Sequence, residues 1–378
     1  MIRYVMKAVI AFAFALQAMV PGVAWSAATA SVPVLDTIGT PRFAKEGGAV
    51  PLPGTRTIPY FTFNQMDPTN NVTYPITYVG APPMLDSRTV VPAVVIPITL
   101  RFDNGVVLNG APRAAQALAS PIFQSFNYSP IGVPYDGQYG DVFMRAQANR
   151  LATGYHVELG APVVLPVVTI DVPKNHGFGA QSGATGALLG LVDIVWFSSR
   201  LQNLIASLQI DPTTLPMFIT DNAFLYIGDP GNCCVIGYHG AGHPTGNGAG
   251  NINSNGNAPI QTFLWATLNT QGIFSAPFIA DIHALSHEVA EWLDDPFINN
   301  LVQPWLTPTA PQYGCTPYLE TGDPVVGIGF NLGPWHPEDE VFGQWFLRES
   351  PSSAFEGRYT FMGPFNPYAG FHVPATGC

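Results

Sequence analysis

The chain has 378 residues, of which 47% are hydrophobic and 12% aromatic, and this composition excludes an intrinsically disordered protein. The formal net charge is -11 and there is no run of basic residues, which argues against a nucleic-acid-binding protein. Only 10% of the residues are charged, whereas glycine (38) and proline (37) are abundant. We therefore expect a loop-rich globular protein with a large apolar core.

Residues 1–26 are typical of a secretory signal peptide. Arg3 and Lys7 precede a short apolar run, and small residues near Ser26 fit a cleavage site. The run is too short for a bilayer span and Pro21 interrupts it, so we expect no stable membrane insertion after cleavage. Cleavage removes two basic residues and no acidic ones. The mature protein is therefore predicted to be acidic and secreted, either extracellular or periplasmic.

Residues 27–92 are rich in proline, threonine and asparagine and have little periodicity, which predicts an irregular extended segment over the body of the protein. One interpretation of this segment is a propeptide that covers the functional site. Residues 93–378 are predicted to form the main domain. Its first strands are expected at Ala93–Phe102 and Val163–Val172. Each contains a proline, which is more typical of an edge or bent strand than of a central one.

The second half of the chain predicts a long helix, then several strands, then another helix. The expected elements are a helix at Ala184–Leu208, strands at Pro216–Ile227, Cys234–Tyr238 and Ile260–Thr267, and a helix at about 279–295. This order is also that of zincin-type metalloproteins. We therefore predict an α+β, zincin-like fold with a mixed sheet, a backing helix, a motif-bearing helix and an irregular N-terminal extension.

The last of these helices carries the sequence His287-Glu288-Val289-Ala290-Glu291, a variant of the H-E-x-x-H zinc signature. His287 and Glu291 are four residues apart, so both lie on one face of a helix and both reach one cation. Glu288 then lies where it can hold a water molecule and act as a general base. The polar side of the helix is expected to face a cleft, with Asp281 or Ser275 as its cap and Pro296 at its end. A surface amphipathic helix is the alternative interpretation.

A catalytic zinc ion usually has three protein ligands, so a third is expected from the region of about residues 315–340. Glu320 is the preferred candidate because it lies in a glycine-containing turn, Glu320-Thr321-Gly322-Asp323. Asp323 and His336 are the alternatives. The competing interpretation is a carboxylate that caps the turn, or a surface histidine.

Three further histidines lie near this motif in the sequence. His283 could pair with His287 in place of Glu291, or support the site from outside the ligand set. His239 and His243 follow the adjacent cysteines on a glycine-containing stretch. The favoured interpretation of that stretch is a disulfide-tethered loop, and the alternative is that one of the two histidines lines the cleft.

The four cysteines, Cys233, Cys234, Cys315 and Cys378, predict two disulfides in an oxidising compartment. Three pairings are possible. A bridge between neighbouring cysteines is strained, so we expect Cys233 and Cys234 to bond separately to Cys315 and Cys378.

Several of these motifs together resemble the secreted phosphate-induced, EXORDIUM-like proteins. The resemblance rests on the sequence 286–291 (SHEVAE), on Asp295-Pro296, on the 320–323 turn, and on the stretches 233–239 (CCVIGYH) and 341–346 (VFGQWF). It implies secretion and a zincin-like metal site without a settled reaction, and the plant members are associated with cell-wall growth and extracellular signalling. The adjacent cysteines and the acidic segment after His336 depart from the family pattern.

Two functions follow from these features. The first is a secreted zinc-dependent hydrolase, in particular a peptidase, with Zn²⁺ held by His287, Glu291 and either Glu320 or Asp323, and with Glu288 as general base. Its substrate would be a peptide or an extracellular polymer. The second is a non-catalytic extracellular protein that retains a structural or vestigial metal site and binds a cell-surface partner or polysaccharide through its aromatic residues.

Overall fold

The computed structural model describes residues 32–243 and 258–363 and, beyond them, residues 366, 371, 374–375 and 378. Val32–Cys378 form one compact unit. The expected signal peptide lies outside the described residues. Among the helices that the structure describes, none combines the length and the apolar character that a membrane crossing requires.

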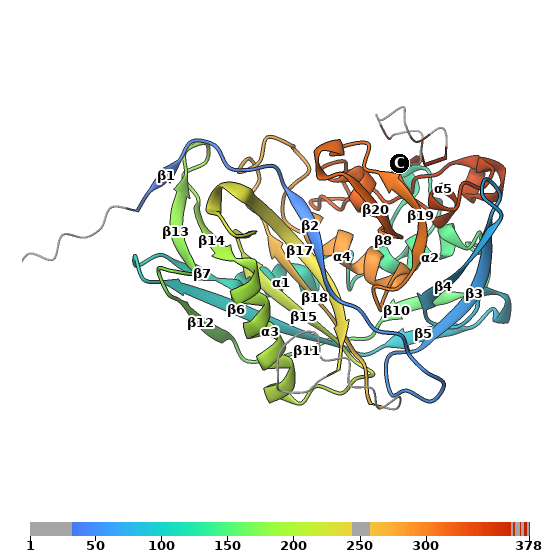
Figure 1. Ribbon diagram of the computed structural model, residues 1–378, viewed down its shortest axis with the longest axis horizontal. Coiled ribbons are helices and arrows are strands. Elements are labelled where there is room, and N and C mark those ends of the chain that lie inside the picture. Colours follow the sequence, from blue (N-terminus) through green and yellow to red (C-terminus); the bar gives the residue numbers. More distant parts are fainter. Residues whose placement is uncertain (1–31, 244–257, 364–365, 367–370, 372–373, 376–377) are drawn as a thin grey trace, which may run out of the picture. The chain divides into compact units, whose positions relative to one another are not determined.

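A large, curled mixed sheet dominates the fold (Figure 1), in the order β1-β13-β14-β16-β17-β18-β15-β6-β11. Strand β2 joins this sheet through β17, and β7 and β12 join it through β6. The strands of this sheet are β1 (Val34–Leu35), β2 (Arg42–Gly47), β6 (Ala93–Phe102), β7 (Val107–Asn109), β11 (Val163–Val164), β12 (Val168–Val172), β13 (Gly177–Ser182), β14 (Leu188–Asp193), β15 (Leu215–Asp221), β16 (Ala223–Tyr226), β17 (Cys233–Gly242) and β18 (Gln261–Leu268).

Four smaller sheets, five α-helices and several short 3₁₀ helices make up the other regular elements of the described residues. The two-stranded sheets are β3 (Tyr60–Asp67) with β4 (Val72–Val79), β5 (Arg88–Val91) with β10 (His156–Leu159), β8 (Phe126–Asn127) with β9 (Asp136–Gly137), and β19 (Leu301–Leu306) with β20 (Cys315–Tyr318). The helices are α1 (Gly110–Ala119), α2 (Tyr139–Gln147), α3 (Ile194–Leu208), α4 (His283–Asp294) and α5 (Gly343–Phe346). The structure is therefore a mixed α+β fold that is rich in sheet.

Helices α3 and α4 use different apolar cores, and alternate residues of β18 supply both cores. Trp265 packs in the core that contains Phe197 of α3. Leu264 belongs to the core that contains Leu285 of α4. Because successive side chains of a strand point to opposite faces, the two helices cover opposite faces of the sheet. Helix α4 thereby lies against β17 and β18.

Strand β6 has the predicted bounds, but the expectation that it is an edge or bent strand is wrong. It lies between β15 on one side and β11 and β12 on the other. Pro97 lies between the residues that pair with β11 and those that pair with β12, where the ladder is already interrupted. A missing backbone N–H is tolerated at such a break. The same break divides the predicted strand Val163–Val172 into β11 and β12.

The predicted helix Ala184–Leu208 is only partly correct. Its first part forms β14, which pairs with β13 and β16, and the helix α3 begins after Asp193. The Asp193 carboxylate accepts a hydrogen bond from the backbone N–H of Trp196 at 2.8 Å, which is the geometry of an N-cap. Sheet pairing therefore overrides the apolar periodicity before that cap.

The N-terminal extension is more regular than predicted. Residues 32–91 contribute β1 and β2 to the main sheet, the β3–β4 hairpin and strand β5. Strand β2 runs parallel to β17, with Lys45 in register with His239. The segment therefore includes a strand of the main sheet, and does not simply lie over the body of the protein.

Helix α4 ends before Pro296, as predicted, but its start and its surroundings differ from the prediction. Its N-cap residue is Ile282, without a side-chain cap, and the Asp281 carboxylate accepts a hydrogen bond from the N–H of Ile282. All residues of α4 are buried. The polar side of α4 therefore faces a closed interior and not the expected cleft.

Two disulfides form, but the predicted pairing is wrong. Cys233 is bonded to Cys234, and Cys315 to Cys378. The adjacent cysteines begin β17 in the main sheet, whereas Cys315 begins β20 in the separate β19–β20 sheet. Cys233 and Cys234 therefore lie in a different sheet from Cys315. The spacing of the cysteines in the sequence could not indicate this arrangement.

Candidate metal centre

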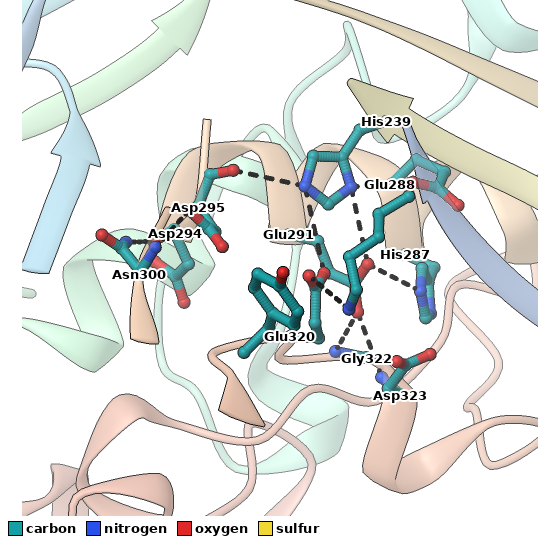
Figure 2. Close-up of polar contacts among 12 residues, drawn as sticks. His239, His287, Glu288, Glu291, Asp294, Asp295, Asn300, Glu320, Gly322 and Asp323 are labelled. Carbon is teal, nitrogen blue, oxygen red and sulfur yellow. Dashed lines mark hydrogen bonds and ion pairs between the residues drawn. The ribbon is translucent and has the colours of Figure 1, made fainter. Parts of the chain in front are cut away.

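Histidines and carboxylates from separate parts of the chain converge beside α4 (Figure 2). Most of these side chains are buried, and Asp323 is half-buried. The contributing segments are β2, β17, α4, the turn at 320–323 and the stretch 338–340. Packing of α4 against β17 brings together residues that are far apart in the sequence.

His287 and Glu291 lie one helical turn apart and face each other, as the motif predicts. The distance from His287 Nε2 to Glu291 Oε2 is 3.0 Å. The other ring nitrogen, Nδ1, lies 2.8 Å from a carboxylate oxygen of Glu338. When Glu338 is ionised it only accepts hydrogen bonds, so Nδ1 then carries the proton and Nε2 presents a lone pair to Glu291. Metal-binding histidines are typically oriented in this way by a second carboxylate.

The turn at 320–323 fixes the Glu291 carboxylate. The backbone N–H groups of Gly322 and Asp323 each donate a hydrogen bond of 3.2 Å to Glu291 Oε1. A Cβ atom on Gly322 would lie 2.2 Å from His287 Nδ1, so only glycine fits there. Donor atoms of His287, Glu291 and Asp323 all lie within 4.8 Å of one another. This set can hold a metal ion.

The other candidate ligands have different partners. Glu320 Oε1 accepts a hydrogen bond of 2.9 Å from the ammonium of Lys45, and Glu320 Oε2 lies 3.9 Å from His239 Nε2. His336 pairs with Asp281 at 2.6 Å, just before α4 begins. Neither Glu320 nor His336 is among the three donors grouped around His287.

Glu288 points toward β17 (Figure 2), where it meets His239, a residue for which the sequence favours a disulfide-tethered loop over a position in the site. The distance from Glu288 Oε2 to His239 Nδ1 is 3.2 Å. A Cβ on Gly237 would lie 2.6 Å from Glu288 Oε1, so this glycine leaves room for the carboxylate. Gly237 and His239 are two residues apart and therefore face the same side of a strand. The two-residue alternation of a strand could have placed His239 in the site. The predicted strand ended at Tyr238, however, whereas β17 continues to Gly242.

His283, the alternative partner of His287, lies beside Glu338. His283 Nε2 is 3.4 Å from Glu338 Oε2, the same oxygen that holds His287. Neither ring nitrogen of His283 makes a hydrogen bond with the described residues. His283 therefore adjoins the residue that orients His287 and is not part of the grouped donors.

Burial shifts the protonation of this cluster strongly. Burial, then the charges of Glu320 and Asp323, raise the pKa of Glu288 and of Glu291 well above the usual range. Burial also raises the pKa of Asp323, to about 6. The pKa of His287 is lowered well below its usual range by burial, with a further contribution from His283. His287 is therefore neutral at physiological pH, which is the form that binds metal.

Lys45 is the lysine that compensates this negative charge. Burial opposes its ionisation, but Glu320 and Asp323 outweigh burial, so the pKa of Lys45 is raised above its usual value. One ammonium cannot neutralise every carboxyl group of the cluster in its ionised form, so burial holds protons on Glu288 and Glu291. A bound cation would allow these carboxyl groups to ionise by pairing with their charge.

Strand β2 covers this cluster. The ring of Phe43 stacks on the imidazole of His287, with the centroids 3.3 Å apart and the planes inclined by 10°. Lys45, two residues further along β2, reaches Glu320. Phe43 and Lys45 therefore cover the cluster on the side of His287 and Glu320.

No family model matches the chain, and neither a curated protein nor a solved structure matches it significantly. The resemblance to EXORDIUM-like proteins therefore stays a prediction from the motifs.

Proposed function

We propose that the protein is a secreted zinc-dependent hydrolase of the peptidase type, with a zincin-like site. The observation that carries this proposal is the convergence of His287, Glu291 and Asp323, whose donor atoms lie within 4.8 Å of one another. One imidazole and two carboxylates suit Zn²⁺. Glu320, the preferred third ligand from sequence, is instead assigned to the ion pair with Lys45.

The donor atoms fit a metal ion on a second criterion. His287 Nε2 and Glu288 Oε1 are buried, and neither makes a hydrogen bond with the described residues. Buried polar atoms without a partner are rare and need an explanation, such as an ion or a water molecule. A zinc ion among these residues would satisfy His287 and offset the charge of Glu291 and Asp323.

The chain supplies a general base next to these donors. A zinc ion held there would polarise a substrate carbonyl and make an attacking water molecule more acidic. Glu288 would take the proton of that water as its oxygen bonds to the carbonyl carbon, and would return the proton to the leaving nitrogen as the amide bond breaks. His239, 3.2 Å from Glu288, would orient the carboxylate. Glu291, an anion in place of the second histidine of the signature, is expected to slow this chemistry by weakening the Lewis acid.

Access to Glu288 requires movement of β2. Phe43 lies on His287 and Lys45 binds Glu320 from the same strand. A peptide or extracellular polymer would therefore reach the site only after β2 has moved away from His287 and Glu320. Release of residues 27–92, if they form the covering propeptide, would provide this movement. We expect the chain as it stands to be a latent form.

A second function is favoured by the burial of the site. Structural zinc sites are closed, whereas catalytic sites keep one open position. Glu288 and Glu291 are at most 1% exposed, and β2 covers His287. A non-catalytic extracellular protein with a structural metal ion would have the same features. In that case Glu288 would contribute only to stability.

Elemental mass spectrometry of the purified protein, followed by a peptide-library assay, tests both functions. The proposal expects zinc in the wild type, and its loss in His287→Ala and Glu291→Ala. Glu288→Gln should keep a zinc ion at His287 but lose roughly 10²–10⁴-fold in turnover. If the protein binds zinc but cleaves no peptide of the library, even as the Phe43→Ala variant, the result would favour the structural function. Folded protein without any bound metal would contradict both metal-site proposals.

A further inference from the structure

The imidazole of His239 has a defined orientation in the interior. Its Nε2 lies 3.3 Å from the backbone carbonyl oxygen of Asp295. A carbonyl oxygen only accepts hydrogen bonds, so Nε2 of the neutral ring carries the proton. Its Nδ1 is then a lone-pair atom, and His239 is fully buried.

This lone pair faces two carboxylates. Nδ1 lies 3.2 Å from Glu288 Oε2 and 3.6 Å from Glu291 Oε2. When the two carboxylates are ionised, three acceptors meet without a donor between them. A cation at their centre resolves this conflict. Metal-binding histidines usually have this arrangement: one ring N–H donates to a carbonyl oxygen or carboxylate, and the other ring nitrogen binds the metal.

We propose that His239, Glu288 and Glu291 bind a second divalent cation of the zinc class. Donor atoms of these three residues lie within 4.8 Å of one another. The inference rests on the proposed function only in that Glu291 would serve both ions. Glu291 Oε2 lies 3.0 Å from His287 Nε2 on one side and 3.6 Å from His239 Nδ1 on the other. Paired metal ions in hydrolytic sites lie about 3.5–4 Å apart, a spacing that a shared carboxylate suits.

The surroundings of Glu288 also fit this second site. Gly237 leaves space beside Glu288 Oε1, and this oxygen makes no hydrogen bond with the described residues. The ammonium of Lys45 is bonded to Glu320 and so does not serve Glu288. A proton on Glu288 is the competing way to satisfy His239 Nδ1, and the experiment below separates the two.

Occupation of the second site has a chemical consequence. A lone pair of Glu288 that binds a cation cannot accept a proton from water. The form with one ion would therefore be the form in which Glu288 acts as a base, and the second ion would inhibit it.

Zinc titration of the metal-free full-length protein, followed by calorimetry and elemental analysis, tests the inference. The wild type is expected to bind two ions per chain. His239→Ala and Glu288→Gln should each bind one, and Asp323→Ala should lose the other. Glu288→Gln has nearly the same shape, so it keeps the test valid if His239→Ala does not fold. The control is His243→Ala, because His243 interacts with the Pro259 carbonyl at the end of β17 and should leave the count at two.

Each result decides between the possibilities. A wild type that binds one ion, with His239→Ala unchanged, overturns the second site and leaves a proton on Glu288 as the explanation. A His239→Ala variant that still binds two ions also overturns it. Absence of zinc from every variant would be a failure of the first site and of the proposed function.

Discussion

The ring of Phe43 lies flat on the imidazole of His287, with the centroids 3.3 Å apart. The two residues are 244 positions apart in the sequence. Strand β2 brings them together by pairing in parallel with β17, beside which α4 lies. A strand near the N-terminus therefore covers the face of α4 that carries His287.

Removal of the Phe43 ring is expected to open the site. In Phe43→Ala, the rate at which EDTA removes zinc from the loaded protein should rise roughly tenfold, which corresponds to a barrier lowered by about 1.4 kcal/mol. A colorimetric chelator in a stopped-flow experiment measures this rate. Phe63→Ala is the control, since Phe63 packs on Phe61 and Tyr78 in the β3–β4 hairpin. Equal rates in the wild type and Phe43→Ala would mean that β2 does not limit access.

Replacement of Lys45 should destabilise the metal-free protein more than the zinc-loaded protein. Lys45→Met leaves Glu320, 2% exposed at its side chain, without its cation. Loss of one partner from a buried ion pair typically costs about 3–5 kcal/mol, and the partial exposure of Lys45 places the expected loss at or below the lower value. Urea unfolding in EDTA and in zinc measures the difference. Lys174→Met, at an exposed lysine, is the control. An equal loss of stability in EDTA and in zinc would show that Lys45 and the metal ion do not offset the same carboxylate charges.

The stability of the metal-free protein should fall between about pH 4 and pH 6. Burial raises the pKa of Asp339 from 3.8 to about 6. The folded protein therefore binds this proton more tightly than the unfolded chain, so the stabilisation is complete below the unfolded pKa and is lost as pH rises through the folded value. The expected loss is roughly 3 kcal/mol.

Thermal unfolding in EDTA across this pH range measures that loss. Asp339→Asn should flatten the profile, because an amide does not titrate and still offers an oxygen to the N–H of Met362. Asp323, whose pKa is also about 6, acts in the same direction. Its ionised form is needed to bind metal, so zinc should weaken or reverse the slope. An unchanged slope in Asp339→Asn would exclude Asp339 as a source.

Gly322→Ala should remove the metal site by steric conflict. The new Cβ would lie 2.2 Å from His287 Nδ1, so either the turn or the imidazole has to move. Overpacking of this kind typically costs about 1–3 kcal/mol, and we expect zinc binding to be lost as well. Denaturant unfolding and elemental analysis provide the two measurements. Gly242→Ala is the matched control, because a Cβ there meets no atom within 4 Å. Normal zinc content in Gly322→Ala would mean that His287 is not a ligand.

Local patterns in the sequence were sufficient for several elements. The bounds of β6 agree with its apolar run, and Pro296 ends α4 because proline cannot continue a helix. The contact between His287 and Glu291 was also predictable, since a separation of four residues places two side chains on one helical face. Asp193 gave an available N-cap signal for α3 that the apolar periodicity obscured.

Long-range pairing decided the rest. His239 reaches Glu288 only through the position of β17 beside α4, and Glu338 orients His287 from 51 residues away. Glu320 pairs with Lys45, which β2 carries into the cluster, whereas Asp323 groups with His287 and Glu291.

The sequence by itself therefore determined the helix that presents His287 and Glu291, because the helical repeat is set by residues close together in the chain. Tertiary structure alone decided which residues surround that helix, which strand closes it and which cysteines pair. Strand register and packing join segments that are distant in the sequence, and local residue patterns do not encode those distances.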